Sequence, residues 1–149
     1  MQYGNPPSTA KVGGHPIHPM LVPFPIACFV GTFVTDLVYW RTTAVMWQQF
    51  SAWLLTAGLV MAGFAVVAGL VDFIGSRRIR ALREAKAHVA LNTVALVLSV
   101  VNAFVHSRDG YTAVVPTGLI LSGVVVVILM LSGWMGWAMV YRRRVGVAP

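Results

Sequence analysis

The chain has few of the residues that soluble enzymes use for chemistry. It contains one cysteine, Cys28, so it can form neither an internal disulfide nor the C-x-x-C-H site that attaches c-type haem. Only 10% of its 149 residues are charged, and four of these are acidic. No phosphate-binding loop or dinucleotide fingerprint occurs, because the glycines lie inside apolar stretches. We therefore do not expect the chain to be an enzyme on its own.

Long apolar runs dominate the sequence instead. Hydrophobic residues make up 58% of the chain, and its mean hydropathy is +0.77. A helix needs about 20 apolar residues to cross a bilayer, at about 1.5 Å per residue. The runs that reach this length are 21–40, about 53–74, 88–106 and about 114–141. The sequence therefore predicts an all-α integral membrane protein. We expect a single four-helix bundle over residues 1–149, with residues 1–20 as a cytoplasmic N-terminal segment.

The basic residues predict the orientation of the spans. Four spans place both termini, and the loop between the second and third spans, on one side of the membrane. Of the 11 Lys and Arg residues, only Arg41 and Arg108 fall on the other side. Because positive charge is retained on the cytoplasmic side, we expect both termini in the cytoplasm. The first span does not read as a secretory signal, since no basic patch precedes it and no small-residue cleavage site follows it.

The polar residues of the third span lie on one face. They are four, seven, three and four positions apart, and at about 100° per residue they fall within roughly an 80° arc. Lipid would leave their hydrogen-bonding groups unsatisfied. We therefore expect this face to contact other helices. The residues are His88, Asn92, Ser99, Asn102 and His106.

The first two spans also have distinct faces. The second carries small side chains on one side, which let helices approach closely, and Asp72 continues that side. The first places polar residues on one side. We expect both faces to point into the bundle. The small residues of the second span are Gly58, Ala62, Ala65 and Gly69. The residues that share one side of the first span are His18, Pro25, Thr32 and Asp36.

The segment His15-Pro-Ile-His18-Pro puts two imidazoles at the mouth of the first span. With Asp72 and His88 they form an inner layer of three imidazoles and a carboxylate. Neutral imidazole is a good ligand for iron, copper, nickel and zinc, and a carboxylate can complete or orient the set. We therefore predict a metal site of His15, His18, Asp72 and His88, or a haem b iron held between His18 and His88. The alternative is a hydrogen-bonded cluster that caps helix ends or handles protons.

A second, outer layer of polar groups lies at the opposite ends of the spans. Asp36 and Arg108 can form an ion pair between the first and third spans. His106 has no second outer histidine, so a bis-histidine haem is not expected in this layer. We expect these groups, and Asn92 beside the inner layer, to be structural. The outer layer consists of Asp36, Asn102, His106, Arg108 and Asp109.

Several motifs occur in the order found in one bacterial family. They are Gly14-His15-Pro-Ile-His18-Pro and the apolar residues after it, Gly69-Leu-Val-Asp72, His88-x-x-x-Asn92, and Gly133-Trp-Met-Gly136 followed by Val140-Tyr141. On these motifs the chain resembles the membrane-protein family known as domain of unknown function 2231. The resemblance extends from about residue 14 to residue 147.

This resemblance implies four helices and a bacterial inner membrane, but no established activity. Some members of the family are linked to soluble redox modules. Carried over by position, the candidate site residues are His15, His18, Asp72, His88 and Asn92. The chain departs from the family near its end. Tyr141-Arg142-Arg143-Arg144-Val145 stands where the family tends to have Tyr-x-His-Gly-Val, which removes a further histidine from any site.

Two hypotheses for the function follow. In the first, the chain is a redox or metal-binding subunit that holds haem b or a transition metal and exchanges electrons with a redox partner protein. In the second, it is a non-catalytic anchor or assembly subunit of a larger membrane complex. Both place it as a multi-pass protein in the lipid bilayer of a bacterial inner membrane. Nucleic acid is not an expected partner, because no aromatic residues are interleaved with the basic run from Arg77 to Lys86.

Overall fold

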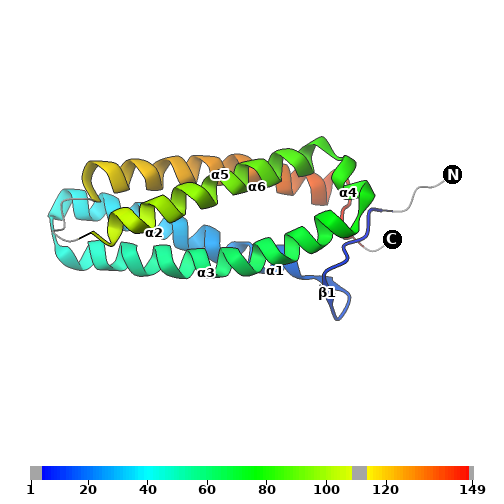
Figure 1. Ribbon diagram of the computed structural model, residues 1–149, viewed down its shortest axis with the longest axis horizontal. Coiled ribbons are helices and arrows are strands. Elements are labelled where there is room, and N and C mark those ends of the chain that lie inside the picture. Colours follow the sequence, from blue (N-terminus) through cyan, green and yellow to red (C-terminus); the bar gives the residue numbers. More distant parts are fainter. Residues whose placement is uncertain (1–4, 109–113, 148–149) are drawn as a thin grey trace.

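The computed structural model describes residues 5–108 and 114–147 and is mostly helical. Asp109 therefore lies outside the described residues. Four long helices run side by side as a bundle (Figure 1): α2 (Pro23–Thr42), α3 (Val45–Gly75), α5 (Arg83–His106) and α6 (Leu119–Tyr141). The short elements are β1 (Lys11–Val12), β2 (His15–Pro16), α1 (Ile17–Leu21), α4 (Arg77–Ala81) and the distorted turn η1 (Val114–Gly118).

The four predicted spans are confirmed as helices long and apolar enough to cross a membrane. Two of them begin earlier than hydropathy indicated. The second begins at Val45 rather than near residue 53, and the third at Arg83 rather than at residue 88. A helix satisfies its backbone hydrogen bonds whether or not its side chains are apolar. Polar residues such as Gln48 and Glu84 therefore end a hydrophobic run without ending the helix.

The bundle consists of two helical hairpins. In the first, α2 packs most extensively on α3, and in the second α5 packs on α6; further contacts join α2 to α6 and α3 to α5. The first hairpin reverses at Thr43, whose backbone is left-handed (φ 56°). The hairpins are joined by α4, where the side chain of Ser76 caps the backbone N–H of Ile79.

The two ends of the bundle differ. We call the end with α4 and both chain ends the terminal end, and the end with the α2–α3 reversal the loop end (Figure 1). At the terminal end, the backbone N–H of Gly146 donates to the carbonyl of Pro6 over 2.9 Å. The Asn5 amide donates to the carbonyl of Val147 over 3.2 Å. Both chain ends therefore lie together, on the same side as α4.

An apolar cluster fills the middle of the bundle. Phe29, Leu55, Ala62 and Val125 are buried there, with the partly buried Leu59, Leu96, Leu98, Ala103 and Leu129 packed against them. The small-residue face predicted in the second span lies inside the bundle, as expected. Gly58, Ala62 and Ala65 are buried, and Gly69 is half-buried. The cluster separates the polar groups of the terminal end from those of the loop end.

Candidate functional site

His18 lies in the short helix α1, at the terminal end of the bundle. Its Nδ1 is 2.7 Å from the carbonyl oxygen of Ala65 in α3. The ring rests against Gly69, where a Cβ would come within 2.9 Å of Nδ1. That is closer than two non-bonded atoms approach, so this position of the ring depends on a residue without a side chain at 69.

His88 occupies the matching place on α5. Its Nδ1 is 2.9 Å from both the carbonyl oxygen and the Oγ of Ser132 in α6. The Asn92 amide donates to the carbonyl of His88 over 2.8 Å and to Oγ of Ser132 over 2.5 Å. Ser132 therefore fixes the orientation of the His88 ring, and Asn92 holds the Ser132 hydroxyl in place.

The two imidazole rings are neighbours in a T-shaped arrangement. Their ring centroids are 6.0 Å apart and their planes meet at 89°. A backbone carbonyl can only accept a hydrogen bond. Each histidine Nδ1 that lies within hydrogen-bond distance of a carbonyl therefore carries a hydrogen atom. In the neutral ring, Nε2 of each histidine then keeps its lone pair. The pair thus presents two imidazoles of fixed tautomer, held by two different helices.

Two of the four predicted inner-layer residues do not join this pair. Asp72 Oδ1 instead accepts hydrogen bonds from the N-terminal segment: from the Ser8 hydroxyl over 2.8 Å and the backbone N–H groups of Thr9 and Ala10 over 2.6 and 2.8 Å. His15 is exposed on the strand pair β1–β2, opposite Val12. Among residues 5–108 and 114–147, no three His, Cys, Asp or Glu side chains are grouped closely enough to hold a metal ion. The structure therefore assembles only His18 and His88.

An ion pair joins two of the helices at the terminal end. Arg143 donates from Nε and Nη2 to the Glu84 carboxylate over 3.1 and 2.8 Å. The Arg143 side chain is exposed, and that of Glu84 is partly exposed. The arginine thus ties the end of α6 to the start of α5, and it adds no ligand to the histidine pair.

The loop end contains a second, fully buried polar cluster. Asp36 is completely inaccessible to solvent. Its Oδ1 lies 2.9 Å from Nε2 of His106, and its Oδ2 accepts a hydrogen bond from the Ser122 hydroxyl. The ion pair with Arg108 that the sequence allows is not formed among the described residues; Asp36 pairs with His106 instead. Arg108 follows the end of α5 and is exposed, whereas His106, two residues earlier, faces into the bundle.

Neighbouring polar groups complete this cluster. The Asn102 amide donates to Oγ of Ser122 over 3.0 Å, and the Gln48 amide donates to the carbonyl of His106 over 3.1 Å. Asn102 is buried, as expected for the polar face of the third span. Sequence reasoning did not single out Gln48, Ser122 or Ser132. Ser122 and Ser132 are isolated polar residues in a long apolar helix, and that isolation was the available signal. Gln48 stands beside Gln49 near the start of α3, where nothing distinguishes it.

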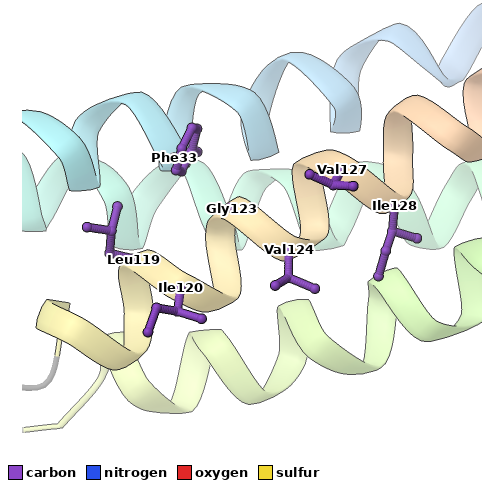
Figure 2. Close-up of a pocket in the computed structure, with 7 residues that line it drawn as sticks. All are labelled: Phe33, Leu119, Ile120, Gly123, Val124, Val127 and Ile128. Carbon is purple, nitrogen blue, oxygen red and sulfur yellow. The ribbon is translucent and has the colours of Figure 1, made fainter.

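One hollow of the bundle lies away from the His18–His88 pair. It is an open groove between α2 and α6 that is lined only by apolar residues (Figure 2): Phe33, Leu119, Ile120, Gly123, Val124, Val127 and Ile128. No titratable side chain lines it. Catalytic or metal chemistry has no group to use in this groove, so the polar clusters at the two ends remain the candidate sites.

Comparisons with known proteins agree with the architecture. The family model described as predicted membrane protein (DUF2231) matches residues 14–149. The chain matches no curated protein and no solved structure. The matched range includes all four long helices, both histidines of the inner pair and the buried cluster at the loop end. The chain therefore belongs to the DUF2231 family of predicted membrane proteins.

Proposed function

We propose that the chain is a small membrane subunit that binds a transition-metal ion, free or as haem iron, between His18 and His88. The observation that carries this proposal is the hydrogen-bonded position of Nδ1 in each of the two neighbouring rings. Each Nδ1 is engaged by a backbone carbonyl of a neighbouring helix, so each Nε2 is available as a ligand. Histidine ligands in metal sites commonly donate their other ring N–H to a carbonyl in this way.

The separation of the rings supports the proposal. A metal–nitrogen bond of about 2.0–2.1 Å places the centre of an imidazole roughly 3 Å from the ion, so two rings on one ion have centres roughly 5–6.5 Å apart. The observed 6.0 Å falls inside this range. The rings are half-buried at the edge of the bundle, which allows a ligand to reach them.

A two-histidine set leaves coordination positions open. Haem would fill them with its own nitrogens, and a free ion would take water or a side chain of a protein partner. We therefore propose a redox subunit that acts with a partner protein or within a larger membrane complex. His15 and Asp72, which stood in the predicted set, are not part of this narrower site, because neither contacts the pair.

One observation favours the second function, a non-catalytic anchor. Nδ1 of His18 joins α1 to α3, and Nδ1 of His88 joins α5 to α6. Contacts of this kind lock helices together whether or not an ion is bound, because an unpaired polar group inside a bundle is costly. The two functions differ in whether the purified protein holds a metal.

The test is the metal content and absorption spectrum of protein purified from membranes without a polyhistidine tag. We expect about one equivalent of one transition metal per chain, with a haem absorption spectrum if that metal is haem iron. His18→Ala and His88→Ala should each lose the metal and keep the helical circular dichroism spectrum. His15→Ala is the matched control, since His15 is exposed and outside the pair. Protein without metal, or with metal retained in both variants, would exclude the site and support the anchor.

We also propose that the protein lies in the bacterial inner membrane with the terminal end in the cytoplasm. Of the 11 Lys and Arg residues, all but Arg41 and Arg108 belong to the terminal end. Positive charge is retained on the cytoplasmic side during insertion. The exposed arginines there would also meet the anionic headgroups of the inner leaflet.

A further inference from the structure

The Asp36–His106 pair at the loop end has no part in the proposed metal site, and the hydrogen atoms around it can be counted. Nδ1 of His106 is 3.0 Å from the carbonyl oxygen of Asn102. That oxygen only accepts, so Nδ1 carries a hydrogen. Nε2 faces the Asp36 carboxyl oxygen at 2.9 Å. Two acceptors cannot share a contact of this length, so one further hydrogen lies between Nε2 and Oδ1.

The pair therefore contains one proton more than a neutral imidazole and a carboxylate would have. This proton belongs either to an imidazolium beside a carboxylate or to a carboxylic acid beside a neutral imidazole. In both arrangements the pair as a whole is neutral, which suits a site that solvent does not reach. Asp36 is 0% exposed and His106 is 4% exposed. Loss of the proton would leave a net negative charge in this site, at a high cost in free energy.

The surroundings favour a bound proton. Hydrogen-bond acceptors outnumber donors there, since Oδ1 of Asn102 is buried and has no hydrogen-bond partner in the part of the chain that the structure describes. The space beside it is lined by Thr32, Ser99, Asn102, Ser122 and the apolar Phe29, Leu55 and Val125, and it is too small for a water molecule. Water therefore does not supply the missing donors.

Among residues 5–108 and 114–147, few other charged groups lie on the helices around the pair. On α2, the last turns carry Tyr39 and Arg41, and Arg41 is exposed over the ring of Trp40. Arg108 is exposed beyond the end of α5. On α3, Gln48 donates to the backbone carbonyl of His106 and Ser51 pairs with Thr35, and both are neutral; η1 and α6 carry no charged residue. The remaining charges of α3 and α5 lie at the terminal end, beyond the apolar cluster around Phe29.

We propose that Asp36 and His106 form a proton-binding site that fastens the two helical hairpins to each other at the loop end. Asp36 belongs to the α2–α3 hairpin, whereas His106 and Ser122 belong to the α5–α6 hairpin. When the proton leaves, an imidazole lone pair and a carboxylate face each other, and the attraction between the hairpins is lost. Because the apolar cluster lies between the two ends, the proton exchanges with the loop side of the membrane and is independent of the His18–His88 pair.

The protonation state can be measured directly in the whole protein. The chain has four histidines, so nitrogen NMR of protein labelled at histidine, in lipid nanodiscs, can be assigned with single His→Gln variants. Labelled aspartate reports whether the Asp36 carboxyl is protonated. At pH 7.5, where an exposed histidine with a pKa of about 6.5 is neutral, we expect a proton on His106 or on Asp36. Neutral His106 together with ionised Asp36 at this pH would overturn the proposal.

A variant tests the fastening role. In Asp36→Asn, the amide can donate to Nε2 of a neutral His106, so the contact no longer needs the extra proton. We expect amide hydrogen exchange at the loop ends of α2 and α5 to rise at least tenfold in the parent protein when the pair loses its proton. NMR identifies the pH at which the proton leaves, and the exchange rates are corrected for the intrinsic rate at that pH. The same rise should be absent from Asp36→Asn. His15→Gln is the control that should behave like the parent. If protection in the parent is unchanged after deprotonation, the pair does not fasten the hairpins.

Discussion

The Ser8 hydroxyl donates a hydrogen bond of 2.8 Å to the carboxylate of Asp72, which lies 64 residues further along the chain. The backbone N–H groups of Thr9 and Ala10 donate to the same carboxylate oxygen. Asp72 is in the last turn of α3, so this contact holds the N-terminal segment across the terminal end of the bundle. The hydrogen bonds of the carboxylate all involve Oδ1 and tie Asp72 to the N-terminal segment rather than to the histidine pair.

We predict that Asp72→Ala releases this segment without unfolding the bundle. Hydrogen bonds to a charged acceptor each contribute about 1.5–3 kcal/mol, and partial exposure places this carboxylate at the lower end of that range. Amide exchange at residues 8–10 should therefore rise about tenfold. Asp72→Asn keeps an acceptor oxygen in place and should show a smaller rise. Unchanged exchange in Asp72→Ala would mean that other contacts hold the segment.

A second prediction uses two glycines of α3. A Cβ at Gly69 would lie within 3.0 Å of two atoms of the His18 ring, whereas a Cβ at Gly63 would meet nothing within 4 Å. Gly69→Ala should therefore displace His18 and lower stability in detergent by about 1 kcal/mol or more, the usual scale of overpacking. Gly63→Ala should leave stability unchanged or raise it by up to about 1 kcal/mol, because alanine favours the helix. Equal melting temperatures for the two variants would contradict the packing of His18 on α3.

A third prediction concerns the apolar cluster between the two polar ends. Phe29 is 3% exposed and packs with Leu55, Ala62 and Val125, whereas Phe24 on the same helix is 56% exposed. Phe29→Ala should destabilise the bundle by about 3–5 kcal/mol, because it leaves a cavity in the core. Phe24→Ala removes the same atoms from the surface and should have little effect. Thermal unfolding of both variants in one detergent checks the difference.

The fourth prediction concerns orientation. Reporters that are active only in the periplasm should be inactive when fused after Pro149 and active when inserted beside Thr43, at the loop end. The physical reason is the retention of the arginines around α4 and after α6 on the cytoplasmic side. A periplasmic signal from the C-terminal fusion would reverse the proposed orientation. It would leave the bundle itself unaffected.

The sequence alone was sufficient for the architecture because the bilayer imposes it. About 30 Å of hydrocarbon demands runs of roughly 20 apolar residues, and helices satisfy their own backbone hydrogen bonds. The same reasoning placed Asn102 and the small face around Ala62 inside the bundle, since helical periodicity determines which residues share a side. The starts of α3 and α5 were missed, because hydropathy measures the apolar run and not the helix.

Only the tertiary structure decided which polar groups meet. The sequence placed Asp72 at the same membrane depth as His18 and His88. In the structure, residues 8–10 fold over the end of α3 and donate hydrogen bonds to Asp72. The sequence also allowed an ion pair between Asp36 and Arg108, whereas in the structure Asp36 pairs with His106. Depth and periodicity place a residue within roughly a helical turn, whereas a hydrogen bond is made or lost within about 0.5 Å. That precision comes from the path of the loops and the packing of one helix on another, which no local pattern in the sequence contains.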